Sequence, residues 1–254
     1  MAKVLMLLPA QDYDPTESAV PWGALRAAGH EVIFATPRGD PAYADERLVR
    51  TGFGPLNALL MTRSEDLTSY ARMIRDPAFR QPLAYAALAG AEYDALLVPG
   101  GHAQGVKTLL ESELAQAAVV DAFKAHKPVA AVCHGVLLLA RSIDPATGKS
   151  VLFGRKTTAL TKAMELAAWG MTKLWLGNYY RTYAQTVEDE VRQTLASAAD
   201  FKSGGPLPLR DRKHMRQVGF VVRDHNYLSA RWPGDCNRLA QELDTGLVPL
   251  TLLL

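Results

Sequence analysis

The chain has 254 residues, of which 48% are hydrophobic and 21% are charged. Its 28 basic and 26 acidic residues nearly balance, so the composition gives no reason to expect nucleic acid or another strongly charged partner. A chain of this length can form one large domain with a full hydrophobic core.

Neither end of the sequence predicts an export signal or a membrane segment. Residues 3–10, KVLMLLPA, carry one basic residue and a short apolar run, a pattern typical of a first strand and too short for a signal peptide. Residues 248–254, VPLTLLL, fall far short of the roughly 20 apolar residues that cross a bilayer. We therefore expect a cytoplasmic protein in which Cys133 and Cys236 stay as free thiols.

Short apolar strands alternate with helical patterns in the first half of the chain. The predicted strands cover residues 3–10, 31–37, 93–101 and 127–135. Apolar residues recur at helical spacing before Gly29 and again over residues 109–127. Strands that are apolar on both faces and alternate with helices predict an α/β fold with a mainly parallel sheet covered on both sides.

The end of the chain contributes further elements to this sheet. Residues 217–230 predict two strands around a turn, and residues 234–246 predict a last helix with Asp235 as its N-cap. Two stretches, at about 38–92 and 144–215, do not fit the alternation. We interpret them as helical insertions that pack together as a cap beside the strand ends, within a single domain of residues 1–254.

The stretch AAVCHG, residues 130–135, ends the fourth strand on Cys133. A nucleophile at a sharp turn from strand to helix needs small residues two positions before and after it, and Ala131 and Gly135 occupy these positions. The amides of the following helix favour the thiolate and predict a lowered pKa for Cys133. The alternative is a buried core thiol, but the small neighbours and the adjacent His134 favour a nucleophile elbow.

Three motifs together resemble those of the ThiJ/PfpI superfamily, a group of class I glutamine amidotransferase-like proteins. They are AAVCHG after a strand, PGG one strand earlier, and a glutamate in the first loop. The resemblance covers a little over half of the chain, over residues 3–37, 93–161 and, more faintly, 218–239. It implies a flavodoxin-like three-layer sandwich and a homodimer.

The resemblance also implies roles for individual residues. Cys133 is the nucleophile, and Glu17 is the carboxylic acid that hydrogen-bonds the thiolate and moves a proton. Backbone amides at Gly100, Gly101 and His134 form the oxyanion hole. Without the resemblance, Glu17 is equally a first-turn helix acid and the glycines a common strand-ending turn.

Two further histidine positions bear on the proposed site. His102 follows the glycine turn and is a candidate for the pocket wall, with an exposed loop histidine as the alternative. Some superfamily members carry a second histidine after a Thr-Thr pair, where this chain has Ala159. His134 is therefore the candidate base, and the sequence identifies no acid that would orient it.

The sequence predicts no cofactor and no metal site. The other histidines have no partner at the spacing of metal ligands; they are His30, His126, His214 and His225. Cys236 is expected to pack in the last helix. An aromatic-rich part of the second insertion, around Tyr180, either walls the pocket or forms a subdomain core or dimer contact.

Two classes of function remain open from the sequence. The first is a cysteine-dependent enzyme acting on a small carbonyl or amide substrate, either a glyoxalase III-like lyase or an amide hydrolase, with the Cys133 thiolate as nucleophile. The second is a redox-sensing or stress-response chaperone-like protein whose Cys133 is reversibly oxidised.

Overall fold

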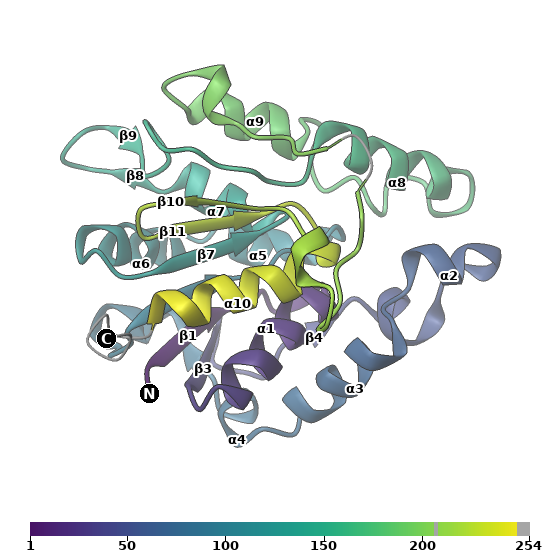
Figure 1. Ribbon diagram of the computed structural model, residues 1–254, viewed down its shortest axis with the longest axis horizontal. Coiled ribbons are helices and arrows are strands. Elements are labelled where there is room, and N and C mark those ends of the chain that lie inside the picture. The colour runs from purple at the N-terminus through teal and green to yellow at the C-terminus, as the bar shows by residue number, and fades with distance from the viewer. Residues whose placement is uncertain (206–207, 248–254) are drawn as a thin grey trace.

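The centre of the protein is a seven-stranded sheet, seen in a computed structural model that describes residues 1–205 and 208–247 (Figure 1). Its strands, in spatial order, are β10 (Val221–Asp224), β11 (Tyr227–Ala230), β7 (Val129–Val132), β6 (Ala95–Val98), β1 (Lys3–Leu7), β3 (Glu31–Thr36) and β5 (Leu83–Ala84). Neighbouring strands are parallel except β10 and β11, which form an antiparallel hairpin. The predicted mainly parallel sheet is confirmed, while residues 248–254 lie outside the described residues.

Helices cover both faces of this sheet, as expected for a three-layer flavodoxin-like sandwich. On one face lie α1 (Pro15–Ala27) and α10 (Cys236–Leu247), which pack against each other (Figure 1). On the other face lie α5 (Lys107–Leu110), α6 (Glu113–Lys124) and α7 (Gly135–Arg141). Because both faces are covered, the central strands are buried along their whole length, and every residue of β6 and β7 is buried.

The two stretches that break the strand-helix alternation carry their own helices. The first contains α2 (Asn57–Leu60), α3 (Ser64–Met73) and α4 (Pro77–Arg80), and the second contains α8 (Lys162–Leu176) and α9 (Val187–Thr194). The first stretch is not an insertion throughout, because its last part extends the main sheet as β5. Phe79 of α4 packs on Phe34 of β3, with ring centroids 5.2 Å apart.

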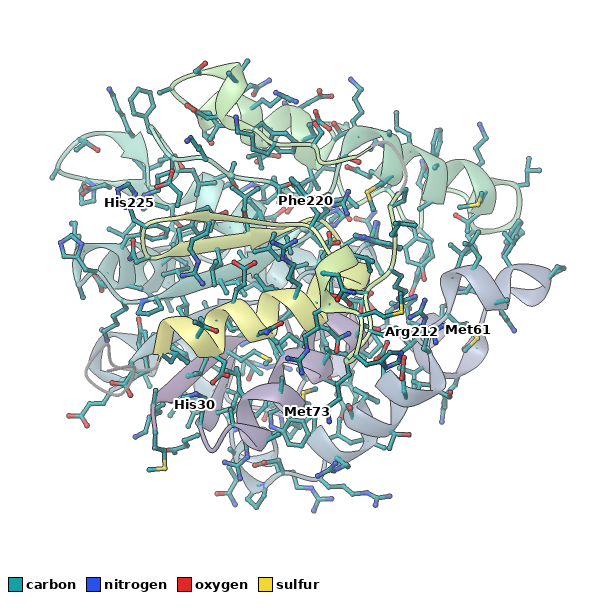
Figure 2. All side chains as sticks on the ribbon, in the orientation of Figure 1. His30, Met61, Met73, Arg212, Phe220 and His225 are labelled. Atoms are coloured by element: carbon teal, nitrogen blue, oxygen red, sulfur yellow. The ribbon has the colours of Figure 1, made fainter. Side chains whose placement is uncertain are left out.

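The two stretches meet beside the carboxyl ends of the strands. Asp45 accepts hydrogen bonds from the hydroxyls of Tyr179 and Tyr180, at 3.1 and 2.8 Å. Phe53 packs on Tyr180 with ring centroids 5.7 Å apart, and Met61, which follows α2 (Figure 2), packs against the same cluster. This small apolar cluster joins the stretches into a cap, separate from the main core.

Several short elements complete the described structure. Two small strand pairs are β2 (Gln11–Tyr13) with β4 (Tyr43–Ala44), and β8 (Ile143–Asp144) with β9 (Lys149–Ser150). A π-helical turn covers Arg47–Thr51, and 3-10 turns cover Gly54–Leu56, Tyr85–Gly90, Gln104–Val106, Ala198–Asp200, Arg216–Val218 and Pro233–Asp235. Within residues 1–205 and 208–247, none of the helices has the length and apolar content required to cross a membrane.

Candidate active site

Cys133 occupies a strained turn between β7 and α7. Its φ is 58°, a left-handed conformation that is costly for a residue with a side chain. A Cβ on Gly135 would collide with the carbonyl oxygen of Val98, and a Cβ on Gly100 would lie 2.7 Å from the amide nitrogen of His134. The predicted nucleophile elbow is therefore present, and its close packing requires glycine at both positions.

Glu17 lies in the first turn of α1 and reaches the elbow from the neighbouring strand end. It is fully buried, and its Oε2 accepts a hydrogen bond from the Gly100 amide at 2.8 Å. Its Oε1 is buried and has no hydrogen-bond partner among the residues that the structure describes. Burial, and then the charge of Asp14, raise the pKa of Glu17 well above its usual range, which favours its protonated form.

Burial also raises the pKa of the Cys133 thiol, an effect strengthened by Glu17 and Asp14 and opposed by the His134 amide. The sequence-based prediction of a lowered pKa is therefore wrong. That prediction counted the amides of α7 but not the complete burial of the sulfur beside two carboxyl groups, which outweighs them. The resting thiol is protonated, so its activation requires a base.

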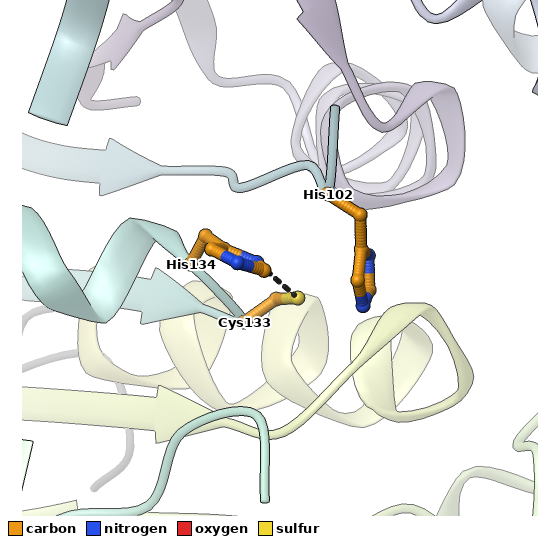
Figure 3. Close-up of side chains that lie close together, drawn as sticks. All are labelled: His102, Cys133 and His134. Atoms are coloured by element: carbon orange, nitrogen blue, oxygen red, sulfur yellow. Dashed lines mark hydrogen bonds between the residues drawn. The ribbon is translucent and has the colours of Figure 1, made fainter. Parts of the chain in front are cut away.

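His134 is placed to act as that base. Its Nδ1 lies 3.6 Å from the Cys133 sulfur (Figure 3). Its Nε2 lies 3.1 Å from Oγ1 of Thr182. The Thr182 hydroxyl donates its single proton to the carbonyl oxygen of His102 at 2.5 Å, so it can only accept from Nε2. This assigns the proton to Nε2 and leaves the Nδ1 lone pair facing the thiol.

The surroundings keep His134 neutral. Burial lowers its pKa well below the usual range, and His102, Arg141 and Arg181 lower it further. Among the described residues no carboxylate hydrogen-bonds either ring nitrogen, whose partners are the Cys133 sulfur and the Thr182 hydroxyl. A threonine from the cap thus holds the position that an orienting acid would take.

His102 is not an exposed loop residue. It is half-buried, its ring packs edge-on to that of His134 at 4.9 Å, and burial lowers its pKa to about 4 (Figure 3). Ligand atoms of His102, Cys133 and His134 lie within 4.8 Å of one another. The group offers one sulfur and two nitrogen atoms, which are the types of ligand that zinc takes in proteins. The sequence missed this grouping because the fold brings His102 to the elbow.

Of the other positions considered in the sequence, only Gly101 lies at the elbow. Gly101 has no room for a side chain, since a Cβ there would collide with the carbonyl oxygen of Asp12. Ala159 lies fully buried in the main core, as does Cys236. His30 and His225 lie on the side of the molecule away from α2 and α8, each beside an aspartate (Figure 2).

A cavity of about 420 Å³ lies next to the elbow, between the strand ends and the cap. His102 lines it together with Asp14, Thr16, Leu48, Phe53, Leu59, Leu60, Thr62, Leu160, Ala163, Met164, Ala167, Ala168, Met171, Thr172, Tyr180, Pro208, Arg210, Trp232 and Pro233. Neither this cavity nor a larger hollow of about 700 Å³ between α1, α3 and α10 is lined by Cys133, His134 or Glu17, but of the two only the smaller is lined by His102, whose ring packs on His134. The smaller cavity is therefore the candidate substrate site.

Sequence reasoning missed three polar residues of this site. Asp14 is the N-cap residue of α1, and its side chain accepts hydrogen bonds from the amides of Thr16 and Glu17. An aspartate followed by a proline is a sequence pattern typical of a helix N-terminus. Thr182 and Arg210 come from the second stretch and carry no local signal, because only the packing of the cap brings them to the strand ends.

Fold and site together define a class of protein: a flavodoxin-like α/β domain with a buried cysteine at a nucleophile elbow, beside a buried glutamate and a neutral histidine. A family model described as ThiJ/PfpI family-like matches residues 8–202. The chain belongs to this family, as the three sequence motifs indicated.

Individual relatives add detail to this assignment. The chain is 26% identical to the glutathione-independent glyoxalase hsp3102 of Schizosaccharomyces pombe over 153 residues, which are 59% of this chain and 60% of that relative. Its fold is similar to that of glyoxalase III from Candida albicans, with a TM-score of 0.67, 19% identity and 96% of each chain covered. The Rapid Encystment Protein 24 kDa of Francisella tularensis gives a TM-score of 0.69 at 15% identity, covering 98% of this chain and all of that one.

Proposed function

We propose that this protein is a cysteine-dependent enzyme that converts 2-oxoaldehydes into 2-hydroxy acids without glutathione. The observation that carries the proposal is the His134 Nδ1 lone pair, 3.6 Å from a buried Cys133 thiol and fixed there by Thr182. The relative named as a glutathione-independent glyoxalase supports this choice of reaction. The same nucleophile and base would serve an amide hydrolase, but no relative named above carries that activity.

The first step forms a bond between sulfur and carbon. His134 Nδ1 takes the thiol proton as the Cys133 sulfur attacks the aldehyde carbon, and it then gives this proton to the resulting oxyanion, which yields a hemithioacetal and the neutral base. The amide of Gly100 is already used by Glu17, so the oxyanion role falls to the amides of Gly101 and His134. The protonated Glu17 donates a hydrogen bond to the sulfur during this transfer.

The remaining steps move hydrogen within the substrate and add water. His134 removes the proton from the former aldehyde carbon, the neighbouring ketone oxygen gains a proton, and an enediol forms. Protonation of the second carbon and loss of the hydroxyl proton from the first give a thioester of the 2-hydroxy acid. Water then hydrolyses this thioester and releases the Cys133 thiol. The sum is substrate plus water, so the reaction needs no external oxidant or reductant.

The test is turnover of methylglyoxal and phenylglyoxal in glutathione-free buffer, with lactate and mandelate measured as products. Cys133→Ser should lower turnover by about 10³-fold or more, since the hydroxyl is a far weaker nucleophile. Cys236→Ala changes the other thiol and should keep most of the activity. Equal rates for the wild-type protein and Cys133→Ser would overturn the proposal.

The redox-sensing alternative is less well supported. Oxidation by peroxide favours an accessible thiolate, whereas Cys133 is fully buried with a raised pKa. Mass spectrometry after mild peroxide treatment separates the two functions. We expect Cys133 to stay unmodified under conditions that oxidise exposed thiols, and a stoichiometric sulfinate at Cys133 would favour the sensor. The homodimer and the cytoplasmic location stay predictions.

A further inference from the structure

We propose that the cap cavity selects 2-oxoaldehydes that carry an aromatic or branched apolar group, in preference to methylglyoxal. This rests on the proposed function, because it names the substrate class of the same site. Three independent features of the cavity carry it: its volume, the separation of polar from apolar residues along its wall, and its connection to the elbow through His102.

The volume is larger than a small aldehyde requires. The cavity holds about 420 Å³, within the range of sites that enclose drug-sized ligands. Methylglyoxal has five non-hydrogen atoms and would leave most of this space to water. An aryl or branched-alkyl substituent would instead displace water from the apolar wall, which is the favourable outcome.

Polar groups gather at one end of the cavity. Asp14 and His102 come from the loops at the strand ends, and the Asp14 amide donates to the Gly100 carbonyl at 2.9 Å. Arg210 lies at this end as well, with its guanidinium 3.5 Å from Oγ1 of Thr16 and 3.9 Å from Oδ2 of Asp66. The charged and ionisable residues of the lining are therefore near the elbow.

Most of the remaining wall is apolar and comes from the two cap stretches, with two threonines, Thr62 and Thr172, and with Trp232 and Pro233 from the end of the chain. Helix α8 contributes the face formed by Ala163, Met164, Ala167, Ala168 and Met171, which recur at helical spacing. From the first stretch, the lining includes Leu48, Phe53, Leu59 and Leu60. A substrate with its carbonyl groups at the polar end thus directs its substituent into an apolar chamber.

His102 connects this chamber to the nucleophile. The same side chain lines the cavity, and one of its ring nitrogens lies within 4.8 Å of the Cys133 sulfur and of a ring nitrogen of His134. The ring of Tyr180 packs edge-on to His102 at 6.0 Å on the cap side. A carbonyl carbon brought to the sulfur therefore places its substituent past His102, against the cap.

The first measurement compares kcat/KM for phenylglyoxal and methylglyoxal in glutathione-free buffer. Burying one large apolar group favours the aryl substrate by about 10- to 100-fold. Ala168→Trp fills the chamber and should reduce this preference at least about tenfold, mainly through phenylglyoxal. Leu166→Trp, on the part of α8 outside the lining, is the matched control and should leave the ratio unchanged.

A second variant covers the chance that a tryptophan disturbs folding. Met164→Gln keeps the length of the side chain but makes the wall polar, and we expect a several-fold loss of the aryl preference with little change for methylglyoxal. A ratio near one in the wild-type protein, or the same ratio in the wild-type, Ala168→Trp and Met164→Gln proteins, would overturn the inference while leaving the proposed function intact.

A readout that needs no turnover keeps the two proposals separate. Alkylation of Cys133 by phenacyl chloride and by chloroacetone is followed by mass spectrometry, and each rate is divided by that of glutathione. We expect the phenacyl reagent to be favoured about tenfold or more, and Ala168→Trp to remove this advantage. If neither aldehyde is turned over, the proposed function fails, yet this ratio still decides the inference. Equal normalised rates, or no alkylation by either reagent, would contradict it.

Discussion

The elbow and the cap contribute to the candidate site in different ways. The elbow region supplies the reacting groups, Cys133 and His134 from the end of β7 and Glu17 from the first turn of α1, and all three are buried. The cap supplies most of the apolar cavity wall and is joined by a small cluster around Phe53 and Tyr180. The difference teaches that chemistry and substrate choice depend on separate parts of the chain. Changes at the elbow should alter the rate for every substrate, and changes in the cap should alter the preference among substrates.

Replacement of the base should give the largest effect. His134→Gln keeps a similar size but cannot take the thiol proton, so we expect kcat to fall by about 10²- to 10⁴-fold for methylglyoxal and phenylglyoxal alike. Steady-state kinetics with both substrates checks this. A loss confined to one aldehyde would show that the elbow also controls substrate choice, which would contradict the division of roles between elbow and cap.

The reactivity of Cys133 towards iodoacetamide should rise steeply with pH. Only the thiolate reacts, and burial raises the pKa of this thiol above its ordinary value. We therefore expect the alkylation rate to increase about tenfold for each pH unit between pH 6 and 8, which is about 10²-fold in total. Stopped-flow kinetics or timed mass spectrometry measures it. A plateau below pH 7 would mean that the thiolate is the resting form.

The sequence predicted the elbow region far better than the cap. The strands were readable because they are apolar on both faces, and the elbow because Gly135 and Ala131 flank Cys133. Strand β5 was missed since two residues carry no periodic pattern. Thr182 was missed because it meets His134, 48 positions earlier, only after the cap has packed. The raised pKa of Cys133 was missed for the same reason, since burial is a property of the whole fold.

Asp14 lies where the two regions meet, and its substitution should change stability with pH. Burial raises its pKa from 3.8 to about 6. Between these values the folded state holds the proton more tightly than the unfolded state, so this group's contribution is largest below pH 4 and is lost as the pH rises through 6. Asp14→Asn keeps a side-chain oxygen that can accept the N-cap hydrogen bonds of α1, and it removes the buried charge.

We expect Asp14→Asn to raise the free energy of unfolding at pH 8 by up to about 3 kcal/mol, with the gain shrinking towards zero near pH 4. Urea denaturation at both pH values measures this. Asp45→Asn, at a buried carboxyl within the cap, offers a comparison away from the elbow. An equal loss of stability at both pH values in Asp14→Asn would show that its charge is instead needed for folding.

Thr182 is the exception that sharpens the comparison, because a cap residue here supports the chemistry. Its hydroxyl fixes the tautomer of His134 by accepting from Nε2 while donating to the His102 carbonyl. Thr182→Val keeps the shape but removes this acceptor, so we expect kcat to fall about tenfold with KM nearly unchanged, the loss of one hydrogen bond of about 1.4 kcal/mol. Thr182→Ser keeps the hydroxyl and should restore most of the rate.

Both effects should be equal for methylglyoxal and phenylglyoxal, because Thr182 acts on the base and is not part of the cavity lining. If Thr182→Val instead changed the ratio between the two aldehydes, or if Thr182→Ser were as slow as Thr182→Val, the hydroxyl would not be positioning the base, and the cap would act on substrate choice alone.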